Sequence, residues 1–140
     1  MKTPRPYGLK FHHLGLAVKN PASAIKFLAG LGYNLGAVVR DEAQNVNLML
    51  CAGRGMPAVE IIYPTEKPGP LAPILKANAS LIYHICYECR DLDKALCALE
   101  ADNNRILLTA PPKPAVLFGG RKVSFYTVIG FGMIEILEPA

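Results

Sequence analysis

Two histidines and two glutamates stand in strand-like segments where polar side chains are unusual. His13 and His84 are each followed by an aliphatic residue, and Glu60 and Glu135 are each flanked by Val or Ile. Burying a carboxylate without a partner is strongly unfavourable. Two imidazoles and two carboxylates, however, are a suitable ligand set for one divalent metal ion, which removes that penalty. Metal binding is therefore the first chemistry that these four residues indicate.

The four residues belong to an internal repeat. The segments that begin at His13 and His84 both run through apolar residues to a basic and then a helix-capping residue, and they are 71 positions apart. Glu60 and Glu135 lie in a second pair of matching segments, 75 positions apart. If a pseudo-twofold axis relates the halves, all four side chains meet at one point. The alternative is a structural polar pair in each half.

Both halves have the same order of predicted elements. Asn20 followed by Pro21 predicts a helix start after the first strand, and Asp91 predicts the corresponding start in the second half. Apolar residues at helical spacing follow in each case. Three strand-like runs come next, at 33–40, 46–51 and 58–63 in the first half and at 105–108, 122–126 and 133–137 in the second. A short helix is expected at 73–78.

The pattern predicts an α+β fold of two tandem βαβββ modules around a shared metal cleft. A length of 140 residues suits one domain, spanning 1–140, with module 1 at about 11–64, a linker at about 65–80 and module 2 at about 81–139. No apolar run approaches the ~18 residues of a membrane span, and the four cysteines are expected to be free, buried thiols in a reducing cytosol. We therefore expect a cytoplasmic protein with no membrane partner.

The net charge of +4 is mild and suits an anionic small molecule. Nucleic-acid binding usually needs Lys and Arg clustered on one element. The chain has no such cluster, so no nucleic-acid partner is expected.

Four segments resemble the vicinal oxygen chelate superfamily, which includes glyoxalase I, extradiol dioxygenases and bleomycin-resistance proteins. Within it the likeness is greatest to the methylmalonyl-CoA epimerases, and it covers about residues 11–139. The resemblance implies a glyoxalase-like fold, the metal ligands His13, Glu60, His84 and Glu135, and a homodimer. It rests on His13-Leu14-Gly15-Leu16-Ala17-Val18, Val59-Glu60-Ile61-Ile62-Tyr63-Pro64, Tyr83-His84-Ile85-Cys86-Tyr87-Glu88 and Gly132-Met133-Ile134-Glu135-Ile136-Leu137-Glu138.

A site of this composition suits proton transfer at a carbon next to a carbonyl. A divalent ion polarises the carbonyl, and catalytic carboxylates of Glu60 and Glu135 on opposite sides of a substrate exchange a proton between its two faces. Two carboxylates, two imidazoles and open positions favour Co²⁺, Mn²⁺, Ni²⁺ or Zn²⁺. The sequence predicts a metal-dependent epimerase or isomerase acting on a small molecule such as the acyl-CoA thioester methylmalonyl-CoA.

Substrate binding is expected near a Gly pair. Gly119 and Gly120 predict a tight turn at the mouth of the site, and Arg121 or Lys122 is expected to reach an anionic substrate. The alternative is a plain hairpin turn with solvated bases.

Other functions of the same superfamily stay open, because segment 111–121 departs from the epimerase pattern beyond its Gly pair. They are a glyoxalase-type lyase, a tailoring enzyme of small-molecule biosynthesis, and a protein that binds a drug or metabolite. Resistance proteins of this fold generally lack the full ligand set, so the complete set favours an enzyme. The fourth ligand disfavours an iron oxygenase, which more commonly uses two histidines and one carboxylate.

Overall fold

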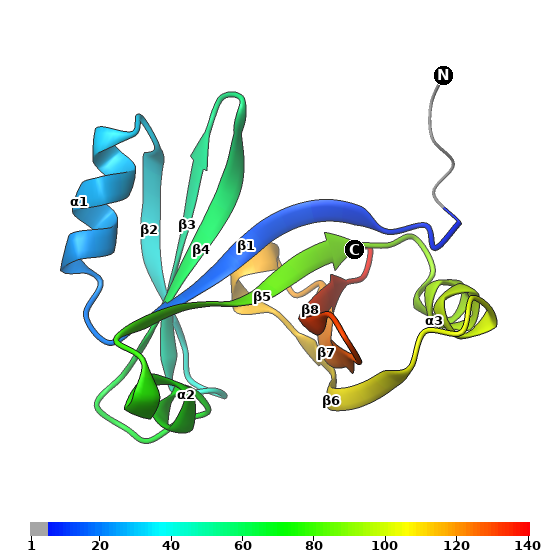
Figure 1. Ribbon diagram of the computed structural model, residues 1–140. Coiled ribbons are helices and arrows are strands. Elements are labelled where there is room, and N and C mark those ends of the chain that lie inside the picture. Colours follow the sequence, from blue (N-terminus) through cyan, green and yellow to red (C-terminus); the bar gives the residue numbers. More distant parts are fainter. Residues whose placement is uncertain (1–5) are drawn as a thin grey trace. The chain divides into compact units, whose positions relative to one another are not determined.

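The computed structural model describes residues 6–140 and divides them into two compact units. The N-terminal unit is His13–Tyr83, and the C-terminal unit combines residues 6–12 with residues 84–140. Along the chain, each half repeats one order of elements, strand, helix and three strands (Figure 1). The prediction of an α+β fold built from tandem βαβββ modules is confirmed.

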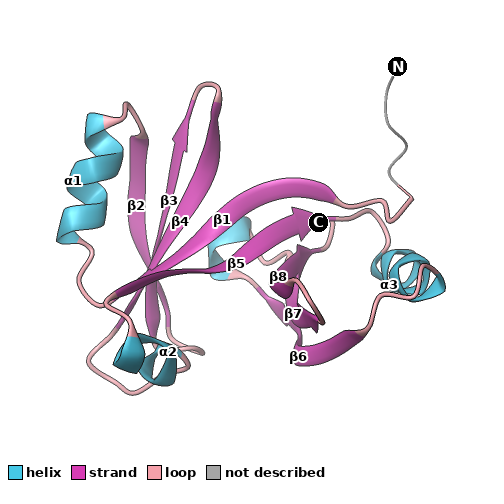
Figure 2. Ribbon diagram, viewed as in Figure 1, coloured by secondary structure: helices cyan, strands magenta, loops and turns pink. Residues whose placement is uncertain are grey.

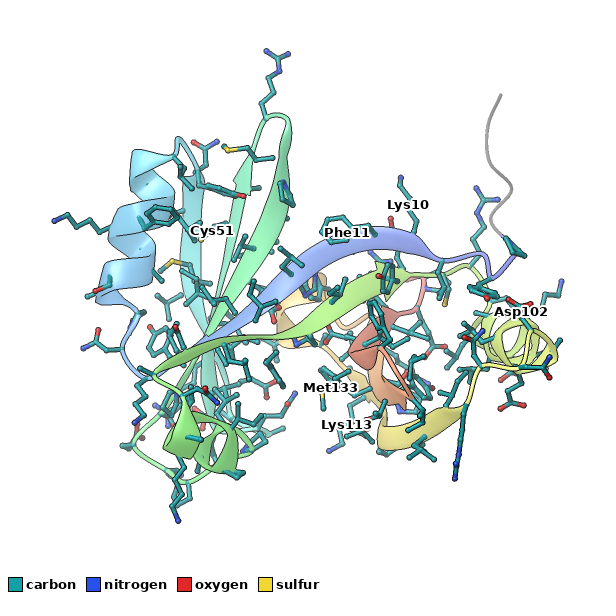
Figure 3. The ribbon with its side chains drawn as sticks, in the orientation of Figure 1. Lys10, Phe11, Cys51, Asp102, Lys113 and Met133 are labelled. Carbon is teal, nitrogen blue, oxygen red and sulfur yellow. The ribbon has the colours of Figure 1, made fainter. Side chains whose placement is uncertain are left out.

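The strands of the first module are ordered β2-β3-β4-β1. Strand β4 runs parallel to β1, and the other neighbours are antiparallel. Helix α1 lies beside β2 (Figure 1). Buried side chains form the core of this unit, among them Leu28 of α1 and Cys51, which is labelled in Figure 3. The elements are β1 (Lys10–Val18), α1 (Ala22–Gly30), β2 (Asn34–Asp41), β3 (Val46–Gly53), β4 (Met56–Pro64) and α2 (Leu71–Ala77).

The strands of the second module follow the equivalent order β5-β8-β7-β6. Strand β8 is parallel to β5 and antiparallel to β7. Ala95 of α3 packs against Cys89, Tyr126, Ile134 and Ile136 to form the core. The elements, distinguished by type in Figure 2, are β5 (Ser80–Glu88), α3 (Leu92–Ala101), β6 (Ile106–Pro114), a 3₁₀ turn (Val116–Phe118), β7 (Lys122–Val128) and β8 (Gly132–Leu137).

Both long helices begin close to the predicted residues. The Asp91 side chain accepts a hydrogen bond from the backbone N–H of Lys94 at 3.1 Å, as expected of an N-cap. Asn20 Oδ1 accepts from the N–H of Ala22 at 2.9 Å, and α1 begins at Ala22, so that Pro21 takes the cap position. None of the helices within residues 6–140 is long and apolar enough to cross a membrane.

The largest difference from the predicted elements is in β6. The prediction ended this strand at residue 108, but it continues to Pro114. Prolines are tolerated there because β6 lies at the edge of the sheet, where no strand within residues 6–140 pairs with its outer N–H groups, and its register is irregular. The turn that follows contains Gly119 and Gly120 at φ values of 64° and 84°, as the Gly pair predicted.

Candidate active site

A buried His–Glu pair lies within the C-terminal unit. Strands β5 and β8 are parallel, and their register places Cys86 opposite Glu135. His84 precedes Cys86 by two residues and therefore faces the same side of the sheet. Its Nε2 atom lies 3.2 Å from Glu135 Oε1, and both residues are at most 5% exposed. Sheet register, rather than proximity in sequence, brings these two side chains together.

The N-terminal unit contains an equivalent pair. Parallel strands β1 and β4 place Gly15 opposite Glu60. His13 precedes Gly15 by two residues, just as His84 precedes Cys86. The distance between His13 Nε2 and Glu60 Oε2 is 3.7 Å, and exposure is 0% for His13 and 4% for Glu60. The internal repeat therefore extends from the sequence to the strand register and to the side-chain pair.

Both pairs have the chemistry of metal ligands. Two donors that each lie about 2.1 Å from one ion, at tetrahedral or octahedral angles, are separated by roughly 3.0–3.4 Å. The 3.2 Å separation in the His84–Glu135 pair falls in this range. The 3.7 Å separation in the His13–Glu60 pair needs a shift of a few tenths of an ångström. The donor types and their burial thus fit a divalent cation, and each pair matches two of the four predicted ligands.

Apolar and aromatic side chains surround the pair in the C-terminal unit. The Phe125 ring meets the His84 ring edge to face at a centroid distance of 5.4 Å. Cys86 packs with Val123 and Leu137 in a buried cluster. Electrostatic interactions in such apolar surroundings are stronger than in solvent. The sequence analysis did not identify Phe125, although it occupies the β7 position opposite Glu135.

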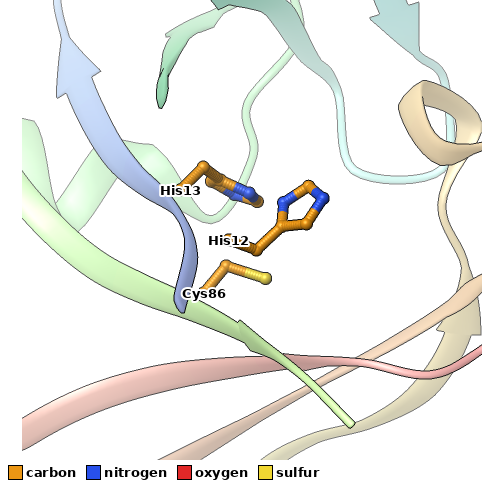
Figure 4. A group of neighbouring side chains, drawn as sticks. All are labelled: His12, His13 and Cys86. Atoms are coloured by element: carbon orange, nitrogen blue, oxygen red, sulfur yellow. The ribbon is translucent and has the colours of Figure 1, made fainter. Parts of the chain in front are cut away.

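His12 is another aromatic side chain of the C-terminal unit. Its ring meets the Phe118 ring edge to face at 5.2 Å. A ring nitrogen of His12 also lies within 4.8 Å of Cys86 Sγ (Figure 4). The imidazole therefore packs against the short turn that precedes β7.

The two basic residues predicted to bind substrate have different environments. Arg121 is partly buried: its Nε donates to the carbonyl oxygen of Glu138 at 2.8 Å, and its guanidinium pairs with Glu88 Oε2 at 3.3 Å. Arg121 also lines a cavity of the C-terminal unit. Lys122 is exposed at the start of β7 and is not among the residues that line this cavity. The geometry thus favours Arg121 of the two, and its contact with substrate stays a prediction.

None of the four cysteines, which all lie within residues 6–140, forms a disulfide. Burial raises the pKa of the Cys51 and Cys89 thiols, which keeps them protonated and unreactive. Cys97 is exposed, so the expectation of four buried thiols holds for only three of them.

The tandem βαβββ modules, each with a buried His–Glu pair, define a glyoxalase-like α+β class of protein. Residues 12–125 match the family model of the glyoxalase/bleomycin resistance protein/dioxygenase superfamily. The chain belongs to this superfamily, as the sequence resemblance indicated.

Its relatives include epimerases at low sequence identity. The ethylmalonyl-CoA/methylmalonyl-CoA epimerase of Cereibacter sphaeroides is 29% identical over 106 residues, which cover 74% of this chain and 78% of that protein. The crystal structure of methylmalonyl-CoA epimerase from Mycobacterium tuberculosis superposes with a TM-score of 0.74, at 23% identity, over 95% of this chain and 88% of that one. A Streptomyces coelicolor methylmalonyl-CoA epimerase in complex with 2-nitronate-propionyl-CoA gives a TM-score of 0.72, at 18% identity, over 94% and 97%.

Proposed function

We propose that this chain is a metal-dependent epimerase or isomerase that moves a proton at the carbon next to the carbonyl of an acyl-CoA thioester such as methylmalonyl-CoA. The observation that carries the proposal is the repetition of one buried His–Glu pair, in the same strand register, in both units. A single buried pair has a purely structural explanation. Two pairs at equivalent positions need a common cause.

We assign the metal ligands as His13, Glu60, His84 and Glu135. Their donor types suit Co²⁺, Mn²⁺, Ni²⁺ or Zn²⁺. A divalent ion bound by these residues supplies Lewis-acid polarisation of a carbonyl oxygen. The burial of all four side chains supports the assignment, because such groups need a counter-charge that solvent does not provide.

The chain's own residues perform the proton transfer. Glu60 and Glu135 occupy equivalent positions in the two modules, so one takes the proton from one face of the α-carbon and the other returns a proton to the opposite face. His13 and His84 lie beside these carboxylates, with Nε2···Oε separations of 3.7 and 3.2 Å, and would hold the same ion. The surrounding apolar and aromatic side chains make electrostatic interactions in the site stronger than they would be in solvent.

The acyl-CoA substrate is inferred from relatives and from charge. The Cereibacter and Mycobacterium relatives are described as epimerases of acyl-CoA compounds, and the Streptomyces enzyme is described in complex with an acyl-CoA analogue. A net charge of +4 suits a phosphate-bearing ligand. Segment 111–121, which departs from the epimerase pattern, belongs to β6 and the turn before β7. The substrate screen therefore compares methylmalonyl-CoA with a second thioester.

The test is a substrate screen on purified protein, first stripped of metal and then loaded in turn with Co²⁺, Mn²⁺, Ni²⁺ or Zn²⁺. Methylmalonyl-CoA and ethylmalonyl-CoA are compared with the hemithioacetal of methylglyoxal and glutathione. We expect metal-dependent epimerisation of a thioester. Turnover of the hemithioacetal alone would assign a glyoxalase-type lyase instead, and tight binding of a metabolite without turnover would assign a binding protein. Light scattering on the same protein tests the predicted homodimer.

A further inference from the structure

A cavity of about 680 Å³ opens in the C-terminal unit. It lies where the segment before β1, the end of β5 and the first turn of α3 come together. Four cationic side chains line it, whereas only two carboxylates do. The cations are Lys10, Arg90, Lys94 and Arg121, and the carboxylates are Glu88 and Asp91. Figure 3 labels Lys10 on β1.

Both carboxylates already have partners within the protein. Glu88 accepts from the Arg121 guanidinium at 3.3 Å, and Asp91 caps α3 by accepting from the backbone N–H of Lys94 at 3.1 Å. Among residues 6–140, Lys10, Arg90 and Lys94 form no ion pair. The cavity therefore has a surplus of two positive charges, and the adjacent N-terminus of the ten-residue helix α3 adds a partial positive charge.

The rest of the lining is apolar or aromatic. Leu9, Cys89 and Ala95 contribute a wall that continues into the core of the unit. Tyr7 also lines the cavity, and its hydroxyl group is held by Asp102 and Asn104. A volume of this size, with apolar walls and a few placed charges, suits an organic ligand better than a bare inorganic ion.

Strand β5 carries both His84 of the buried His–Glu pair and Glu88 of the cavity lining. Every second residue of a strand faces the same side, so His84, Cys86 and Glu88 share one face of β5. The pairing of β5 with β8 is regular from Ile85 to Glu88. Four residues of strand span about 13 Å. A ligand with its carbonyl beside His84 and Glu135 would therefore need a long arm to place an anionic group in the cavity.

We propose that this cavity binds the phosphate-bearing nucleotide end of a CoA thioester. This inference rests on the proposed function, in which the substrate is a CoA thioester. Such a thioester carries its phosphates at the far end of a long flexible arm from its reactive carbonyl. Arg90 and Lys94 contact the phosphates, Lys10 adds charge at the rim, and the wall of Leu9, Tyr7 and Ala95 receives the adenine ring.

Titration calorimetry on the full, metal-free chain tests the proposal with two probes, CoA and adenosine 3′,5′-bisphosphate. We expect both to bind, and the double variant Arg90→Ala/Lys94→Ala to weaken both by about tenfold or more. Both positions are exposed, so this variant is expected to fold. The matched control is Lys26→Ala, because Lys26 is an exposed lysine on α1, the equivalent helix of the other module. Glu88→Gln should tighten binding by removing a negative charge.

Several results would overturn the cavity assignment. The first is a double variant that binds both probes as tightly as the unchanged chain. The second is an equal loss of affinity in Lys26→Ala, and the third is that the unchanged chain binds neither probe. Inorganic phosphate that competes as well as the bisphosphate would indicate a site for a free anion rather than for a CoA nucleotide.

The two proposals fail in distinguishable ways. If the bisphosphate binds through Arg90 and Lys94 but no thioester exchanges its α-proton, the reaction is wrong and a phosphate-ester site remains. If a thioester turns over with the same KM in the double variant, the cavity assignment is wrong and the reaction remains.

Discussion

His84 Nε2 lies 3.2 Å from Oε1 of Glu135 in the interior of the C-terminal unit. The two residues are far apart in the sequence, and parallel pairing of β5 with β8 brings them together. The N-terminal unit repeats this relationship with His13 and Glu60. Because an unpaired carboxylate is costly in such surroundings, the repeated pairing is the feature of the molecule that most needs a functional explanation.

Removing one imidazole tests the ligand assignment. His84→Ala should lose stoichiometric divalent metal, because it removes one of the four proposed donors, all of them buried. His12→Ala is the matched control and should retain the metal, since His12 is not in the proposed ligand set. Elemental analysis before and after dialysis against a chelator measures both variants. Retention of one metal ion per chain by His84→Ala would refute the assignment.

Core packing predicts a large stability effect at Ile136. This residue is 0% exposed and packs under α3, whereas Ile82 of β5 is 62% exposed. Ile136→Ala should lower the free energy of unfolding by about 2–5 kcal/mol through lost burial and a cavity. Ile82→Ala should change it by about 0.5 kcal/mol or less. Urea unfolding followed by circular dichroism compares them, and equal effects would contradict the described packing.

Some of these features follow from local sequence, and others do not. The His–Glu pairs were predictable because polar residues recur at equivalent positions in apolar strands, and helix starts were predictable from Asn20 and Asp91. The continuation of β6 to Pro114 was not, because proline disfavours a strand locally but is tolerated at a sheet edge. The cavity could not be predicted either, since the fold assembles it from Lys10, Arg90 and Arg121, which are distant in sequence.

The Arg40–Glu66 ion pair predicts a shifted titration. Two hydrogen bonds, at 2.7 and 3.2 Å, join the guanidinium to the carboxylate and lower the pKa of Glu66 to about 2. A lowered carboxyl pKa stabilises the fold above pH 4.5, and this contribution is lost as pH falls from 4.5 towards 2. NMR titration of Glu66 should give the low value and, in Arg40→Gln, a return towards 4.5. An unchanged pKa in that variant would contradict the pairing.

Charge reversal separates the roles of two neighbouring bases. Arg121→Glu should raise KM for an anionic thioester by about tenfold or more, because it replaces a cation of the cavity lining with an anion. Lys122→Glu is the control and should change KM little, since Lys122 is exposed and does not line the cavity. Steady-state kinetics with the thioester found in the substrate screen measures both. Equal KM values for the two variants would favour a plain turn with solvated bases.

The central claim is that the chain transfers a proton at the carbon next to a thioester carbonyl and that Glu135 takes part. The most direct measurement is proton NMR of the α-hydrogen of methylmalonyl-CoA in D₂O with the metal-loaded protein. We predict metal-dependent exchange of this hydrogen, slowed about a hundredfold or more in Glu135→Gln. The absence of exchange in every thioester tested, or exchange that is unchanged in Glu135→Gln, would contradict the claim.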